Sequence, residues 1–214
     1  MSKVLVIANG NLVDVQTCRQ RIGEWQPDLV IGVDGGTRHA FTLGLHPDVI
    51  VGDLDSLPEQ DLPADVRIER SPAEKDETDL ELALLYARRQ QAAETVLIGA
   101  LGGRLDMSLA NLLLLTQPAL NDMHIQVWYG TQTARLIRPP GQSIPAAPGD
   151  TLSLIPLVGD ALRVTTHGLK YPLNDEPLHY GPARGISNIF THASAAISLQ
   201  EGLLFAVHTP GRAE

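Results

Sequence analysis

Residues 28–36 read Asp-Leu-Val-Ile-Gly-Val-Asp-Gly-Gly, a short apolar run that ends in an acidic residue and two glycines. The run is rich in β-branched side chains and predicts a β-strand over residues 28–33, while Asp34-Gly35-Gly36 predicts a turn at its carboxyl end. Comparable runs occur elsewhere in the first 130 residues. The other strands expected there cover residues 3–8, 48–51, 95–98 and 125–129.

Helices are expected between these strands. Apolar residues at i, i+3, i+4 and i+7 from Leu80 predict a helix that starts near Thr78. A second helix is expected from Asp106 to Thr116, before Pro118. Apolar strands alternating with helices indicate a parallel sheet covered on both faces, and such sheets bind ligands beyond the carboxyl ends of their strands. The glycine- and aspartate-rich turns are therefore expected to converge in space.

The last third of the chain has a different pattern. Its expected strands are short and closely spaced, with no helical segment between them, over residues 151–158, 162–166, 193–199 and 203–208. Alternating apolar residues in these runs are typical of half-buried antiparallel strands. We therefore predict an α/β domain over residues 1–130 and a small β-sandwich or jelly-roll-like domain over residues 131–214. The proline-rich turn at Pro139-Pro140-Gly141 is expected near the join.

The charge distribution disfavours nucleic acid as a binding partner. The formal net charge is −9, and residues 1–130 carry all of it. This acidic balance argues against nucleic acid as a partner, since phosphate backbones select basic surfaces.

The longest aliphatic run, Leu112–Leu115, is too short to cross a membrane. Cys18 is the only cysteine, which excludes an intramolecular disulfide and fits a reduced, cytoplasmic compartment.

Two aspartates follow the third expected strand directly. In an extended segment, Asp53 and Asp55 point to the same side, so that both can reach one cation. Mg²⁺ is usually held by one or two carboxylates together with phosphate oxygens, which fits this pair. The alternative is an ordinary Asx-turn or helix cap.

A third acidic motif, Lys75-Asp76-Glu77-Thr78-Asp79, opens the first expected helix. Thr78 can cap that helix, and acidic residues in the first turn suit its positive end. The functional interpretation assigns Asp79 to the metal and Lys75 to a phosphate. The alternative is a solvated helix start.

The second expected helix follows a glycine-rich loop, Gly102-Gly103-Arg104-Leu105-Asp106. Glycines allow close backbone approach, a helix N-terminus offers free N–H groups to an anion, and Arg104 can bind phosphate oxygens bidentately. The alternative is a plain loop in which Asp106 is the N-cap. The chain has no Walker lysine loop, so phosphate binding requires an arrangement of this other kind.

Two motifs stand out in the predicted β-domain. Residues 168–173 form an amphipathic, hairpin-like segment that presents Tyr171, and Ser187-Asn188 follow a glycine. Both also fit ordinary turn chemistry.

Taken in order, the ensemble of motifs resembles the thiamine pyrophosphokinase family. The matching segments are Asp34-Gly35-Gly36, Gly52-Asp53-Leu54-Asp55-Ser56, Lys75-Asp76-Glu77-Thr78-Asp79, Gly102-Gly103-Arg104-Leu105-Asp106, Gly168–Leu173 and Arg184-Gly185-Ile186-Ser187-Asn188. The resemblance implies a Rossmann-like N-terminal domain, a C-terminal β-sandwich that binds thiamine and forms a homodimer, and a Mg²⁺-dependent reaction of ATP with thiamine to give thiamine diphosphate and AMP.

The resemblance also implies roles for individual residues. The expected catalytic residues are Asp53, Asp55, Asp79 and Asp106, of which Asp53, Asp55 and Asp79 would hold the metal. The expected ATP-binding residues are Asp34, Gly35, Lys75, Asp76, Gly103 and Arg104. The expected thiamine-binding residues are Tyr171, Ser187 and Asn188. The chain departs from the family in one place, because Met107 follows Asp106 where relatives often carry His.

Three functions remain open at this point. A pyrophosphokinase acting on thiamine accounts for every motif, one acting on a pterin alcohol would differ around Ser187-Asn188, and a non-catalytic nucleotide sensor would not need clustered carboxylates. In the first case the thiamine hydroxyl attacks the β-phosphorus of ATP, and alignment and charge neutralisation supply most of the catalysis. Either Asp79 or Asp106 can accept the hydroxyl proton.

Overall fold

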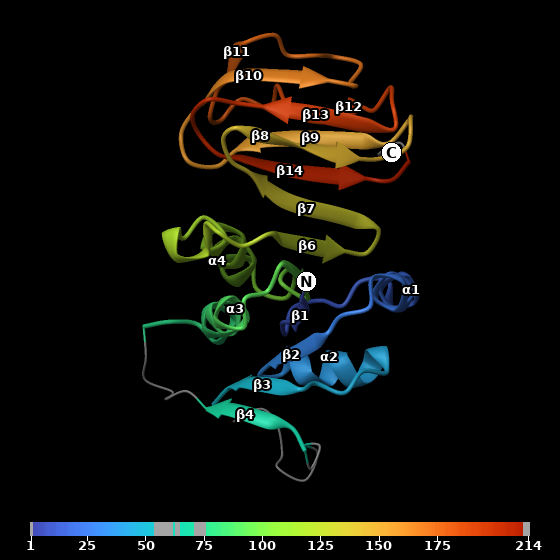
Figure 1. Cartoon of the computed structure of the whole chain (residues 1–214), viewed down its shortest axis with the longest axis vertical. Coiled ribbons are helices and arrows are strands. Elements are labelled where there is room, and N and C mark those ends of the chain that lie inside the picture. The colour runs from blue at the N-terminus through green and yellow to red at the C-terminus, as the bar shows by residue number, and fades with distance from the viewer. Residues whose placement is uncertain (1, 54–61, 63–64, 71–75, 212–214) are drawn as a thin grey trace. The chain divides into compact units, whose positions relative to one another are not determined.

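The computed structural model describes residues 2–53, 62, 65–70 and 76–211. The chain divides into two compact units, Met1–Gly130 and Thr131–Glu214 (Figure 1). Asp55 and Lys75 lie outside the described residues. Among the helices described, none has the length and apolar character needed to span a membrane.

The first unit contains a parallel sheet with strand order β6-β5-β1-β2-β3-β4. Its strands are β1 (Lys3–Ile7), β2 (Leu29–Val33), β3 (Val49–Gly52), β4 (Arg67–Arg70), β5 (Glu94–Ile98) and β6 (Ile125–Tyr129). The five expected strands are confirmed. The additional strand β4 reads Arg-Ile-Glu-Arg and pairs, among the described strands, with β3 alone. Its charged side chains suit an edge strand and lack the apolar pattern that predicts the other strands.

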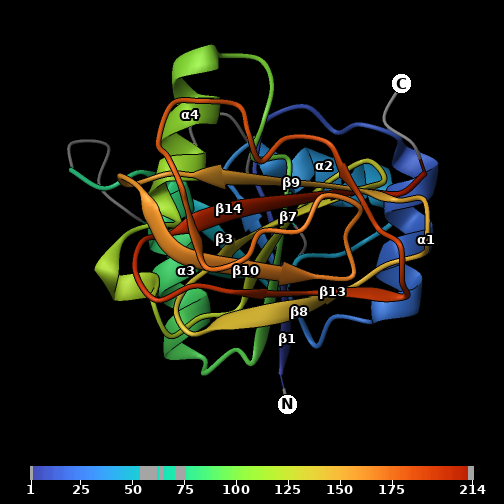
Figure 2. The ribbon, with the colours of Figure 1, turned by 90° about the horizontal axis from the view of Figure 1, so that it is seen from above.

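Helices cover both faces of this sheet. They are α1 (Val15–Trp25), α2 (Gly36–Leu43), α3 (Asp79–Arg89) and α4 (Leu105–Leu114), with a short 3₁₀ helix η2 (Pro118–Leu120). In Figures 1 and 2, α1 and α2 lie on one side of β1 and α3 and α4 on the other. Buried apolar residues of β1 and β5, such as Leu5 and Val96, pack with Ile22 of α1 and Leu43 of α2 in one core.

The structure confirms the expected N-cap of the first helix and corrects that of the second. Thr78 caps α3, because its side chain accepts a hydrogen bond of 3.2 Å from the N–H of Glu81. Helix α4 begins at Leu105, so Arg104 occupies the N-cap position and Asp106 lies in the first turn. The alternative of Asp106 as the N-cap is therefore wrong.

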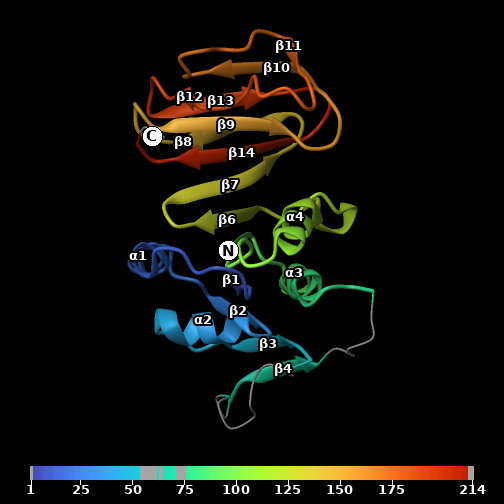
Figure 3. The same cartoon turned by 180° about the vertical axis from the view of Figure 1, so that it is seen from behind.

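The second unit is built from antiparallel strands (Figure 3). Four of its strands are neighbours in the order β12-β9-β14-β7 within the large sheet, and the other four form a separate sheet with the order β11-β10-β13-β8. The strands are β7 (Gln132–Ile137), β8 (Gly141–Pro145), β9 (Thr151–Pro156), β10 (Ala161–His167), β11 (Glu176–Leu178), β12 (Asn188–Ile189), β13 (Ser194–Ser198) and β14 (Leu204–Thr209). The four expected strands correspond to β9, β10, β13 and β14.

One expectation for this unit is corrected. Pro139-Pro140 lies between β7 and β8, inside the second unit and not at the join. Residues 168–173 lie in the loop that joins the antiparallel strands β10 and β11, which agrees with the expected hairpin-like segment, and the N–H of Thr166 donates to the carbonyl of Leu173 at 2.9 Å. Leu169 in this loop makes an isolated antiparallel bridge to Phe190. Loop 168–173 therefore runs beside the segment that leads out of β12.

Candidate functional site

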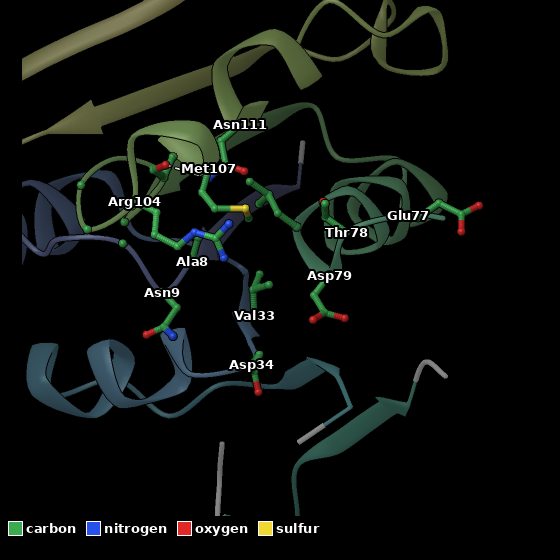
Figure 4. Close-up of a pocket in the computed structure, with 16 residues that line it drawn as sticks. Ala8, Asn9, Val33, Asp34, Glu77, Thr78, Asp79, Arg104, Met107 and Asn111 are labelled. Atoms are coloured by element: carbon green, nitrogen blue, oxygen red, sulfur yellow. Dashed lines mark hydrogen bonds between the residues drawn. The ribbon is translucent and has the colours of Figure 1, made fainter. Parts of the chain in front are cut away.

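The carboxyl ends of the strands of the first unit surround a cavity of about 530 Å³ (Figure 4). This volume is typical of pockets for small molecules. The lining comes from the ends of β1, β2 and β5, from the first turn of α3 and from α4. It consists of Ala8, Asn9, Gly10, Val33, Asp34, Glu77, Thr78, Asp79, Leu80, Gly99, Ala100, Gly102, Gly103, Arg104, Met107 and Asn111.

Backbone contacts hold these strand ends close together. The N–H of Gly10 donates to the carbonyl of Gly99 at 2.7 Å, and the N–H of Asp34 donates to the carbonyl of Val51 at 2.9 Å. Gly99 has φ +66°, and a Cβ at this position would lie 2.2 Å from the carbonyl oxygen of Ala8. Only glycine allows so close an approach of two chain segments. The expected convergence of the glycine-rich turns is thus observed.

The acidic residues gather at one edge of this sheet. Asp34 and Asp79 both line the cavity, and in Figure 4 the Asp79 side chain extends toward the side where Asp34 lies. Asp53 directly follows β3, whose last residue, Gly52, has its Cβ position 3.1 Å from the Cβ of Asp34. Within the described part of the chain, no group of three or more His, Cys, Asp or Glu side chains is arranged to hold a metal.

Some of the other predicted nucleotide-binding residues line the cavity, and others do not. Gly103 and Arg104 line the cavity, while Asp76 is exposed and does not. Gly35 does not line the cavity but lies against Asn9, which does, since a Cβ at Gly35 would be 2.4 Å from the Nδ2 of Asn9.

Arg104 and Asp106 form a bidentate ion pair. Arg104 Nε donates to Asp106 Oδ1 at 3.1 Å, and an Arg104 terminal nitrogen donates to Oδ2 at 2.5 Å. These hydrogen bonds lower the pKa of the Asp106 carboxyl and raise the pKa of the Arg104 guanidinium. Asp106 does not itself line the cavity, so it lies behind Arg104 as that residue's partner.

Sequence reasoning missed several lining residues. Asn9 reads as part of an Asn-Gly turn, and Asn111 lies in a leucine-rich helix where only its polarity sets it apart. Glu77 and Thr78 read as a helix start, although both also border the cavity.

A second, smaller cavity lies within the second unit. It has a volume of about 230 Å³ and contains all three predicted thiamine-binding residues. Its lining is Leu154, Thr166, Tyr171, Pro172, Leu173, Arg184, Gly185, Ile186, Ser187 and Asn188.

The Asn188 side chain clamps the backbone of Tyr171. Its Oδ1 accepts from the N–H of Tyr171 at 3.1 Å and from the N–H of Ile189 at 2.9 Å, and its Nδ2 donates to the carbonyl of Tyr171 at 2.7 Å. Both lone pairs of the amide oxygen are thus occupied, which leaves one N–H for a ligand. Ser187 is exposed with φ +59°, and its N–H donates to the hydroxyl of Ser153 at 3.1 Å.

Comparison with known proteins finds a family model for each part of the chain. The family model described as "Thiamin pyrophosphokinase, catalytic domain" matches residues 24–127, and "Thiamin pyrophosphokinase, vitamin B1 binding domain" matches residues 141–204. A thiamine pyrophosphokinase of Bacillus subtilis is 33% identical over 190 residues, which cover 85% of this chain and 87% of the relative. This chain belongs to the thiamine pyrophosphokinase family. Of the three functions left open by the sequence, membership supports the thiamine enzyme.

Solved structures of thiamine pyrophosphokinases share the fold. The crystal structure of the enzyme from Bacillus subtilis superposes with a TM-score of 0.83 and 28% identity, covering 98% of this chain and 99% of that one. The crystal structure from Geobacillus thermodenitrificans gives a TM-score of 0.81 and 28% identity, with 97% of both chains covered. The mixed α/β fold, with a large sheet and a second antiparallel sheet, is therefore that of thiamine pyrophosphokinases.

Proposed function

We propose that this thiamine pyrophosphokinase binds ATP in the cavity of its first unit and thiamine in the cavity of its second unit. The main support for the ATP site is that one cavity, at the carboxyl ends of parallel strands, is lined by Asp34, Asp79, Gly103 and Arg104. Glycine-rich loops and arginine suit phosphate oxygens, and the carboxylates suit a cation that accompanies them.

Mg²⁺ is the cation that these donors fit. Asp34 and Asp79 line the cavity, and Asp53 follows the neighbouring strand. Carboxylates together with phosphate oxygens and water make a suitable set for Mg²⁺, and we propose that Asp53, Asp79 and the predicted ligand Asp55 hold it, with Asp34 beside them. When bound, Mg²⁺ supplies neutralisation of phosphate charge.

Individual residues of the chain have separate roles in the proposed reaction. The thiamine hydroxyl oxygen forms a bond to the β-phosphorus, the bond from that phosphorus to the oxygen shared with the α-phosphate breaks, and AMP leaves. Arg104 orients phosphate oxygens and stabilises their charge. Asp79 accepts the hydroxyl proton, because it borders the cavity while Asp106 lies outside the lining and is paired with Arg104.

The second cavity suits a flat, cationic ring system. Residues 131–214 carry no net charge, and Tyr171 is 61% exposed at the cavity. An aromatic ring can pack against a planar heterocycle and attracts a cation to its face. We propose that Tyr171 provides such a wall, that the Ser187 hydroxyl hydrogen-bonds thiamine, and that Asn188 offers its remaining N–H.

We propose three further properties. The parallel-sheet unit is Rossmann-like and the antiparallel unit is a β-sandwich, as the resemblance implies. The enzyme is a homodimer formed through the second unit, whose 84 residues have a limited core of their own. Its location is cytoplasmic, which the single cysteine supports.

ATP labelled at the β-phosphate tests the transfer. With thiamine and Mg²⁺, the label is expected in thiamine diphosphate, with AMP formed in equal amount, because attack at the β-phosphorus moves two phosphates in one step. Chromatography of the labelled products provides the measurement. Formation of ADP with thiamine monophosphate would contradict the proposal and indicate attack at the γ-phosphorus.

Replacing both Ser187 and Asn188 by Ala is expected to raise the KM for thiamine about 10-fold or more, since it removes a hydrogen-bonding hydroxyl and the clamp on Tyr171. The KM for ATP is expected to change less than about 2-fold, because the ATP site lies in the other unit and makes no use of these hydrogen bonds. Ser143→Ala, on β8 and outside the cavity lining, is the control. Equal damage to both constants would place the Ser-Asn pair in the nucleotide site.

A further inference from the structure

Asn111 is a buried polar residue at the ATP cavity that the reaction scheme does not use. It lies on α4, one turn after Met107, and is only 8% exposed. Its Nδ2 donates to the carbonyl of Ala100 at 2.7 Å. A carbonyl oxygen only accepts hydrogen bonds, so this contact fixes the orientation of the amide: the nitrogen faces Ala100 and Oδ1 faces away from it.

The Oδ1 atom of Asn111 is an acceptor that faces the cavity. Asn111 belongs to the cavity lining, and no donor among the described residues reaches its oxygen. In Figure 4, the Asn111 side chain extends from α4 on the same side of the cavity as Met107. An amide oxygen at the wall of a cavity can accept a hydrogen bond from a ligand group bound there.

The surroundings indicate which part of ATP carries that donor. Ala8, Leu80 and Ala100 line the cavity and are each about 5% exposed or less, and Met107, which also lines it, is 37% exposed. Asp34 lies at the opposite end of the cavity in Figure 4. Ala100 follows β5 and Asp34 follows β2. Because β1 lies between these two strands, their ends are two strand spacings, or about 10 Å, apart. The apolar end with one amide suits a nucleobase, and the acidic end suits phosphates with their cation.

We propose that Asn111 determines the nucleobase specificity of the enzyme. Its Oδ1 accepts a hydrogen bond from the exocyclic amino group of adenine, and Met107 packs against the ring. A 6-oxo purine presents an acceptor at the same position, so two acceptors would face each other without a proton between them. Arg104, seven residues earlier and about 10 Å away along α4, then lies at the distance of the phosphates. This inference rests on the proposed ATP site.

The test pairs a change in the protein with a change in the ligand. Dissociation constants are measured by calorimetry, with Mg²⁺ and without thiamine, for ATP, for inosine triphosphate and for purine riboside triphosphate, which lacks the 6-amino group. The wild-type protein is expected to bind ATP about 10-fold more tightly than purine riboside triphosphate, and inosine triphosphate more weakly still. Asn111→Ala is expected to reduce the first preference to within about 2-fold, by weakening the binding of ATP alone. Thr116→Ala, at a partly buried position beyond the end of α4 and outside the cavity lining, is the control.

Each outcome bears on a different statement. An unchanged ATP preference in Asn111→Ala would show that Asn111 only anchors Ala100, and would overturn the inference. Equal affinity of the wild-type protein for ATP and purine riboside triphosphate would overturn it without any variant. Failure of all three nucleotides to bind the wild-type protein would overturn the ATP site itself.

Discussion

Replacing Asp79 by Asn is expected to lower kcat at least ~100-fold, because the change removes the negative oxygen that we propose binds the cation and accepts the proton of the thiamine hydroxyl. Asp53→Asn is expected to give a loss of similar size. Folding should change little, since Thr78 still caps α3 and the lost carboxylate contributes only about 0.3–1 kcal/mol at the positive end of that helix. Steady-state rates over a range of Mg²⁺ concentrations, with melting temperatures alongside, provide the measurement.

Asp122→Asn is the matched control for these two variants. Asp122 is an exposed aspartate of the same unit that pairs with Arg88 and lies outside the ATP cavity. Near-normal turnover of Asp79→Asn or Asp53→Asn at limiting Mg²⁺ would show that the carboxylate does not bind the cation.

Replacing Arg104 by Ala is expected to lower kcat/KM for ATP at least ~100-fold, since we propose that its guanidinium neutralises phosphate charge. Arg104→Lys keeps the charge and loses the bidentate geometry, so it should recover only part of the activity. The Arg104 and Asp106 side chains are 73% and 65% exposed, and ion pairs so exposed add little stability. Unchanged melting temperatures would therefore assign the loss to catalysis.

Asp106→Asn separates the two proposed roles of the acidic residues. Hydrogen bonds from Arg104 hold the pKa of the Asp106 carboxyl below its usual range, so that it is ionised throughout an assay near neutral pH. We expect a loss of about 10-fold through misplacement of Arg104, with the shape of the pH–rate profile unchanged. A loss as large as that of Asp79→Asn, together with a shifted pH–rate profile, would instead identify Asp106 as the proton acceptor.

Much of the fold is predictable from local patterns. Five of the parallel strands, helix α3 with its Thr78 cap and four antiparallel strands follow from apolar periodicity and turn residues, which act over a few neighbouring positions. The edge strand β4 and the short strands β11 and β12 lack these patterns, because what defines them is the neighbouring strand with which they pair. Pairing between distant segments leaves little trace in local sequence.

The sequence also determined the chemical content of the site. It places aspartates, glycines and an arginine after expected strands, and a parallel sheet brings such strand ends to one edge. That argument requires only the order of the motifs along the chain. It accounts for Asp34, Asp79, Gly103 and Arg104 meeting at one cavity.

Only the tertiary structure decided what each of these side chains faces. Arg104 and Asp106 are two residues apart and equally plausible from the sequence, yet one borders the cavity and the other is its partner. Asn188 clamps the backbone of Tyr171, and Asn111 turns its amide oxygen toward the cavity because Ala100 takes its nitrogen. Hydrogen-bond partners from distant segments determine these orientations. Motifs establish which groups are available, and the packing of strands and helices determines which atoms face a ligand.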